Sequence, residues 1–222
     1  PRVLPRAVVY DATLTTSLPV PMSVASGLNA LAHCVDAMWG PRVDPIDRAL
    51  AGEGIRALAA GLPRVVADPT GLDGREQALY GTYLAAVAFS CAGSGLHHKI
   101  CHVLGGSYDL PHAQTHAVVL PYVLAFNAPA APDAERRIAA ALDADSAIEG
   151  LQRLRHELNA PRALRDHGFD EAHIEDAVRA ILDVAPATNP RPVTAGGMRR
   201  LLRAAWQGAD PTTMTDDQEG PR

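Results

Sequence analysis

The sequence predicts an all-α fold, a helical bundle preceded by a single orphan β-strand. From residue 23 onward, apolar side chains recur at steps of three and four residues, which is the spacing of one helix face. Glycine and proline pairs interrupt these runs at helix-length intervals. Only residues 7–10 combine β-branched and aromatic side chains as a strand does.

The predicted elements follow in chain order. The strand over residues 7–10 has no partner strand, so we expect it to pair with a sheet upstream of this chain, which begins at Pro1. The first helix begins at Ser23 and ends at Gly40-Pro41. Further helices are predicted over residues 45–62, 73–91, 96–104, 115–126, 133–143, 146–158, 170–184 and 194–206.

Three segments are expected from this pattern. Residues 1–20 are expected to hold a last strand and a linker that continue from absent upstream chain, and residues 21–207 to form an all-helical domain. Residues 208–222 are polar, with two prolines and two glycines, and are predicted to be a disordered tail.

Composition excludes several classes of protein. The 222 residues are 47% hydrophobic and 20% charged, enough to bury a core, and the net charge of -5 provides no basic field for nucleic acid. No run approaches the length of a membrane span, and no leader opens the chain. The three cysteines form no disulfide framework. These observations predict a cytoplasmic protein that binds neither nucleic acid nor membrane.

The chemistry-bearing residues gather in one stretch. Five of the nine histidines lie between residues 97 and 116, together with the single lysine, Lys99. His98 and His102 are four apart and share a helix face, and the Gly105-Gly106 pair lets the chain turn so that His112 returns to that face. Asn29 and His33 form a second pair four residues apart. Two such pairs facing a bundle interior predict a catalytic or metal site.

Isolated histidines and the cysteines have a simpler interpretation. Single histidines, such as His156, His167 and His173, are expected on the surface or in the core without a role. Cys34 and Cys101 each adjoin a cluster histidine. Neighbouring helix positions are about 100° apart, so we expect the cysteines to face other packing and not to ligate zinc.

Residues 11–19, 27–39, 95–120 and 189–194 resemble the iron-containing (group III) alcohol dehydrogenase family, and within it the maleylacetate reductases. The resemblance implies a dehydroquinate synthase-like fold with two domains, an active site between them, NADH or NADPH as cofactor and a homodimer. This chain is similar to the helical C-terminal domain. It contains no G-x-G-x-x-G phosphate-binding motif.

The resemblance also identifies a departure at the metal position. Metal-dependent members carry an aspartate and three histidines where this chain has Asn29, His33, His98 and His112. Without the carboxylate, and with Lys99 nearby, metal affinity should fall. No metal is therefore expected. If one binds, these four residues are its ligands.

The implied reaction is the NADH- or NADPH-dependent reduction of the carbon–carbon double bond of maleylacetate to 3-oxoadipate during the degradation of aromatic compounds. Asn29, Lys99 and His112 would attract the dicarboxylate. We expect His33, His98 and His112, as imidazolium or imidazole donors, to stabilise the enolate oxygen with Lys99, and His102 to orient the nicotinamide or relay a proton.

Two alternatives remain open. One is a metal-dependent alcohol dehydrogenase of the same family, and the other is a non-catalytic helical module. Under the leading hypothesis, residues 1–222 alone should be inactive because hydride donor and acceptor meet between domains.

Overall fold

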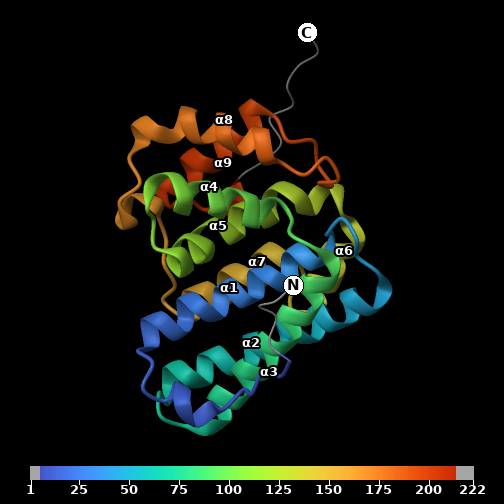
Figure 1. The fold of residues 1–222 in the computed structure, drawn as a ribbon, viewed down its shortest axis with the longest axis vertical. Coiled ribbons are helices and arrows are strands. Elements are labelled where there is room, and N and C mark those ends of the chain that lie inside the picture. Colours follow the sequence, from blue (N-terminus) through green and yellow to red (C-terminus); the bar gives the residue numbers. More distant parts are fainter. Residues whose placement is uncertain (1–5, 214–222) are drawn as a thin grey trace.

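The computed structural model describes residues 6–213, which are helical almost throughout (Figure 1). The α-helices of this part are α1 Val20–Met38, α2 Pro45–Ala67, α3 Leu72–Ala92, α4 Leu96–Tyr108, α5 His112–Asn127, α6 Pro132–Ala141, α7 Ala147–Glu157, α8 Ile174–Val184 and α9 Ala195–Gln207. Short 3₁₀ turns connect several of them. The predicted all-α class is confirmed.

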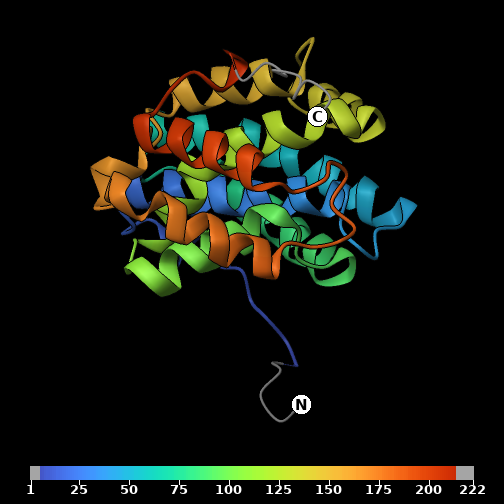
Figure 2. The same cartoon turned by 90° about the horizontal axis from the view of Figure 1, so that it is seen from above.

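Two hydrophobic cores meet at α5. The first core lies among α1, α2, α3, α6 and α7, and the second among α4, α8 and α9. Leu120 and Leu124 of α5 pack into the first core, whereas Val119 and Val123 pack into the second. Twelve of the 16 residues of α5 are buried. Figure 2, seen from above, shows α8 (orange) and α9 (red) lying across the front of the other helices.

The strand predicted over residues 7–10 is not formed among the described residues. The segment is extended, with Val8 62% exposed and Val9 87% exposed. A strand requires a neighbouring strand to satisfy its backbone N–H and C=O groups, and residues 6–213 provide none. Tyr10 instead packs edge-on against Tyr83 of α3, with ring centroids 5.9 Å apart.

Two predicted helix ends were wrong for the same reason. α2 continues through Pro63 to Ala67, and its last turn is held by Val65, which is only 1% exposed. α4 continues through the glycine pair to Tyr108 and ends at Asp109, whose φ of 53° is left-handed. In both places, tertiary packing outweighs the local helix-breaking tendency.

The segment after α9 is partly ordered. Ala209 accepts a 2.8 Å hydrogen bond from the Tyr122 hydroxyl, and Pro211 is buried in a short 3₁₀ turn, Pro211–Thr213. The predicted disordered tail over residues 208–222 is therefore wrong for its first six residues. Residues 214–222 lie outside the described part of the chain.

No single helix between residues 6 and 213 is long and apolar enough to cross a membrane. α3 and α4 pass that test of length and composition only as a pair, and they are bent by 99° relative to each other.

Close packing of α2 on α3 depends on glycine. A Cβ on Gly61 of α2 would lie 2.7 Å from the backbone nitrogen of Ala78, so the two helices would have to separate. We expect Gly61→Ala to lower the free energy of unfolding by about 1–3 kcal/mol despite the better helix propensity of alanine.

Gly52, on the same helix, is the matched control for this prediction. A Cβ there meets only the Met38 side chain, at 3.8 Å, so Gly52→Ala should stabilise the protein by about 0.5–1 kcal/mol. Urea unfolding of both variants measures the two effects. Equal and favourable effects would contradict this account of the α2–α3 contact.

Candidate active site

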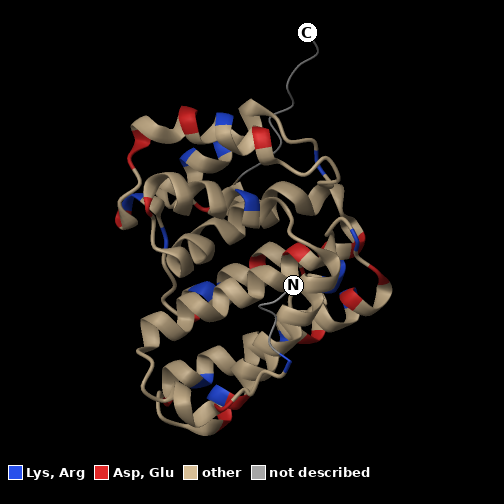
Figure 3. Ribbon diagram, viewed as in Figure 1, with Lys and Arg blue, Asp and Glu red and all other residues tan. Residues whose placement is uncertain are grey.

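The helices around the predicted site are almost free of charge. Together, α1, α4 and α5 carry only two charged side chains, Asp36 and Lys99. Figure 3 shows that the other acidic and basic residues lie on the surrounding helices and loops. Electrostatics within the site therefore depend on one carboxylate, one ammonium group and the histidines.

Asp36 fixes the position of His98. One carboxylate oxygen, Oδ2, accepts hydrogen bonds from His98 Nδ1 at 2.7 Å, from the His98 backbone N–H at 3.2 Å and from the Gly95 N–H at 3.1 Å. Asp36 is fully buried, and His98 is 3% exposed. Asp36 thus caps the N-terminus of α4, where Gly95 offers no side-chain cap. It also holds a proton on His98 Nδ1, which leaves Nε2 for ligand chemistry.

Gly95 makes this contact possible. A Cβ on Gly95 would lie 2.5 Å from Asp36 Oδ1, too close for any side chain. The close approach of α4 to α1, and with it the Asp36–His98 pair, therefore requires glycine at the start of α4.

The histidines form one connected cluster with His98 at its centre. The His98 ring lies 4.7 Å from His33, 4.9 Å from His116 and 6.2 Å from His102, measured between centroids. His112 joins through His116, at 4.4 Å. The structure thus brings together all four predicted catalytic histidines, from α1, α4 and α5. The two helix-spaced pairs thus meet through the contact between the His33 and His98 rings.

Phe89 of α3 forms the apolar wall of the cluster. Its ring stacks on His33 at 4.5 Å and lies 4.3 Å from His98. It is half-buried, so its ring separates the two histidines from solvent on one side.

The remaining predicted residues lie at the edge of the cluster. Asn29 is half-buried one turn before His33, and its Oδ1 is buried with no hydrogen-bond partner. Lys99 is half-buried on α4 and close enough to His102 to affect its ionisation. His102 and His112 are exposed. The exposed side is therefore the one that a substrate or cofactor can reach.

A second, deeper histidine pair lies behind His98. His97 Nε2 is 3.0 Å from His116 Nδ1, and Cys101 Sγ is 3.7 Å from the same His97 nitrogen. Cys101 thus faces His97 and not its neighbour His102. Cys34 is fully buried, and its Sγ lies toward α2, 2.7 Å from where a Gly54 Cβ would be, so it takes no part in the cluster.

Burial keeps several of these rings neutral. Burial lowers the pKa of His33 to about 4, with His98 and His112 adding to the effect and Asp36 opposing it. Burial and the neighbouring histidines lower the pKa of His116 to about 2. Burial, His98 and Lys99 also lower the pKa of His102. These three rings are therefore neutral N–H donors or acceptors at neutral pH, not the imidazolium ions that the sequence left possible.

These shifts predict acid destabilisation. His33 binds a proton more readily in the unfolded chain, where its pKa is about 6.5, than in the folded one. The free energy of unfolding should therefore fall as pH drops from 6.5 to about 4, by about 3 kcal/mol from His33, and this loss should level off below. His116 extends the loss toward pH 2.

Urea unfolding between pH 4 and pH 7 measures this dependence. His33→Asn should flatten the curve, whereas His156→Asn, at an exposed position on α7, should leave it unchanged. Parallel curves for the wild type and His33→Asn would contradict the prediction.

Sequence reasoning missed Asp36, Phe89 and the role of His97. One signal could have identified Asp36, because it is the single charged residue in the apolar helix α1 and lies three residues after His33. No comparable signal identified Phe89, since a phenylalanine near a helix end has no distinctive spacing.

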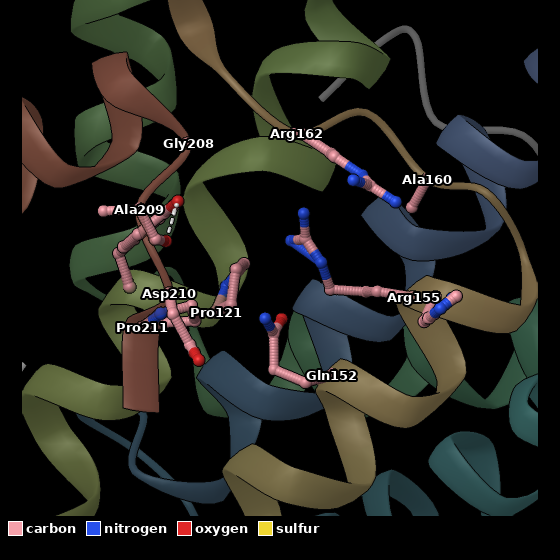
Figure 4. A pocket seen from close by; sticks show the side chains of 11 residues that line it. Pro121, Gln152, Arg155, Ala160, Arg162, Gly208, Ala209, Asp210 and Pro211 are labelled. Atoms are coloured by element: carbon pink, nitrogen blue, oxygen red, sulfur yellow. Dashed lines mark hydrogen bonds between the residues drawn. The ribbon is translucent and has the colours of Figure 1, made fainter. Parts of the chain in front are cut away.

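A separate pocket of about 340 Å³ lies between α5, α7 and the segment after α9. Figure 4 shows Arg155 and Gln152 of α7 extending into it, with Asp210 on the opposite side. Arg155 is 8% exposed and donates to the carbonyls of Ala117, at 2.9 Å, and Pro161, at 2.8 Å. Because Ala117 follows His116, this arginine also anchors the part of α5 that carries the histidines.

The four residues of the metal set do not converge on one point as a set of ligands for a divalent cation. Asn29 replaces the anionic ligand, so the set has no formal charge to offset that of the metal. The nitrogens of His33, His98 and His112 are also not gathered within mutual ligand distance. Within residues 6–213, a different group has its ligand atoms close together. The ligand atoms of His97, Cys101 and His116 all lie within 4.8 Å of one another.

Comparison with known proteins agrees with this architecture. Residues 23–206 match the C-terminal part of the Fe-containing alcohol dehydrogenase family. The chain belongs to this family. The iron-containing alcohol dehydrogenase of Corynebacterium glutamicum is 63% identical, with a TM-score of 0.95, and the match covers 96% of this chain and 60% of that one.

Other members of the family are maleylacetate reductases. The enzyme of Sphingobium indicum is 46% identical over 213 residues, which covers 96% of this chain and 60% of the relative. The maleylacetate reductase structure from Rhizobium sp. strain MTP-10005 is 42% identical, with a TM-score of 0.89, covering 94% of this chain and 59% of that one. This chain thus spans about 60% of the length of its relatives.

Proposed function

We propose that this chain is the substrate-reducing half of a maleylacetate reductase. The observation that carries the proposal is a cluster of histidine rings, centred on the buried Asp36–His98 pair, at the position where the family's metal set has lost its carboxylate. Relatives named maleylacetate reductase, 42–46% identical along nearly the whole chain, support the choice of substrate.

The proposed reaction adds a hydride to the alkene carbon β to the ketone of maleylacetate. Electrons of the double bond move to the ketone oxygen, which becomes an enolate oxygen. His98 Nε2 is buried and without a partner in the protein. Because Asp36 holds one proton on Nδ1, a second proton taken up on Nε2 would let this ring donate to that oxygen. Protonation of the enolate carbon completes 3-oxoadipate. The balance is one hydride from the nicotinamide and one proton.

Lys99 provides the positive charge for the substrate carboxylates in this proposal. The rings of His33, His102 and His116 are neutral because their pKa values are lowered. Lys99 is therefore the side chain of α1, α4 and α5 that carries a permanent positive charge. Asn29 and His112 add polar contacts at the open side. An aspartate at position 29 would repel the dicarboxylate, which agrees with an amide there.

The reduced nicotinamide supplies the hydride when it is bound. We propose that its binding half belongs to the 40% of the relatives' length that this chain does not span, and that exposed His102 faces the nicotinamide. We call a protein that carries this chain together with that half the two-domain enzyme, and we expect it to be a homodimer. Residues 1–222 alone should show no reductase activity.

A metal-dependent alcohol dehydrogenase is the second candidate, because the 63% identical relative carries the name iron-containing alcohol dehydrogenase. Steady-state assays of the two-domain enzyme with maleylacetate and with simple alcohols, each with and without chelator, separate the two. We expect NADH- or NADPH-dependent loss of maleylacetate that chelator does not affect. Alcohol oxidation abolished by chelator, together with stoichiometric iron or zinc, would favour the second candidate.

A further inference from the structure

The pocket between α5, α7 and the segment after α9 contains a buried positive charge without a counter-ion. Arg155 is 8% exposed, and its guanidinium donates to two neutral carbonyl groups, those of Ala117 and Pro161. Within residues 6–213 it forms no ion pair with a carboxylate. Buried arginines are normally paired with an opposite charge. The structure therefore leaves this charge to be balanced by a group from outside the described chain.

Arg155 keeps its charge in this environment. Burial lowers its pKa to about 10, with Tyr122 opposing the effect and Arg162 adding to it. At neutral pH the guanidinium is therefore still protonated. An anion in contact with it would stabilise the charged form and offset part of the cost of its desolvation.

A second arginine lies beside the first. Arg162 directly follows Pro161, whose carbonyl accepts a hydrogen bond from Arg155 at 2.8 Å. Figure 4 shows the two side chains reaching into the same pocket from different segments. Arg162 is exposed and forms no ion pair within the described residues. Two like charges that share a pocket repel each other, and an oxyanion between them turns this repulsion into two attractive contacts.

The other polar groups of the pocket do not neutralise the arginines. Asp210 lies on the opposite side, where its carboxylate accepts a 2.9 Å hydrogen bond from the Thr212 N–H. The Gln152 side chain extends into the pocket, and its Oε1 is buried with no hydrogen-bond partner in the described chain. The hydrogen-bonding capacity of the pocket is therefore not used up internally. Its volume of about 340 Å³ suits a small ligand.

We propose that this pocket binds a small oxyanion, a phosphate or carboxylate group held between the guanidinium groups of Arg155 and Arg162, with the Gln152 amide beside it. Guanidinium groups bind both kinds of oxyanion through paired N–H donors. None of the pocket residues belongs to the predicted catalytic cluster. The proposal therefore does not depend on the proposed function.

Isothermal titration calorimetry of the two-domain enzyme tests this site with two probes, inorganic phosphate and succinate, in separate titrations. Saturating reduced nicotinamide is present so that the nucleotide-binding half is already occupied. Arg162→Gln removes one cation but leaves the bonds of Arg155 to the core, and should weaken binding of the preferred anion by at least about 10-fold. Arg162→Lys keeps the charge and should recover part of the loss.

Arg200→Gln is the matched control, because it makes the same substitution at an exposed position of α9 outside the pocket. It should leave the affinity within about 2-fold of the wild type, since a distant surface charge is screened by salt. Tighter binding of phosphate than of succinate assigns the site to phosphate groups, and the reverse order assigns it to organic acids.

Three results would overturn the proposal. One is the absence of binding of either anion to the wild-type enzyme at millimolar concentration. Another is an unchanged affinity in Arg162→Gln. The third is an equal loss in Arg162→Gln and Arg200→Gln, because the anion would then respond to the net charge of the protein and not to this pocket.

Discussion

His98→Ala is expected to lower kcat of the two-domain enzyme for maleylacetate by roughly 10³-fold, because it removes the proposed donor for the enolate oxygen. His98 is 3% exposed at the centre of the ring cluster, so no other side chain can move into its place without repacking. Stopped-flow or steady-state loss of the reduced nicotinamide measures the effect.

His156→Ala, at an exposed position on α7, is the control and should behave as wild type. His112→Ala should also reduce turnover, but less, because His112 is exposed and its ring joins the cluster at its edge, against His116. Wild-type turnover in both His98→Ala and His112→Ala would refute the histidine chemistry as a whole.

Asp36→Asn should lower kcat by roughly 10²-fold, although Asp36 lies behind His98 and does not contact the substrate in this proposal. The neutral amide loses the charge-assisted bonds to His98 Nδ1 and to the first backbone N–H groups of α4. It can also donate its own N–H to Nδ1 and reverse the tautomer of the ring.

Two comparisons separate this effect from simple loss of stability. Gly61→Ala is also expected to destabilise the fold, but it lies in the α2–α3 contact and should retain wild-type kcat once folded. In a double-mutant cycle, adding Asp36→Asn to His98→Ala should cost little further activity, because the two residues act as a unit. Additive losses would show that Asp36 acts by another route.

Much of the fold follows from local sequence. The three- and four-residue apolar spacing predicted α1 to α9 to within a few residues at most ends, because each helix buries one face. Pro63 and Gly105-Gly106 misled the prediction, because the packing of Val65 and Tyr108 is decided by residues far along the chain. The predicted strand required a partner that no local pattern within this chain could reveal.

The candidate site was predictable where its residues share one helix. His98 and His102 share a face by spacing alone, and so do Asn29 and His33. The bond from Asp36 to His98 joins residues 62 positions apart, and that between His97 and His116 joins residues 19 apart. These contacts depend on how α1, α4 and α5 cross, which periodicity does not specify.

The position of α5 in both cores also has a consequence for protein synthesis. α1, α2 and α3 leave the ribosome before α5, whose Leu120 and Leu124 cover part of their apolar surface. The nascent chain must therefore expose that surface until residue 127 has emerged, and the histidine cluster, which spans α1 to α5, can assemble only after that point. During this interval, we expect a chaperone that recognises exposed apolar helices to bind the unfinished chain.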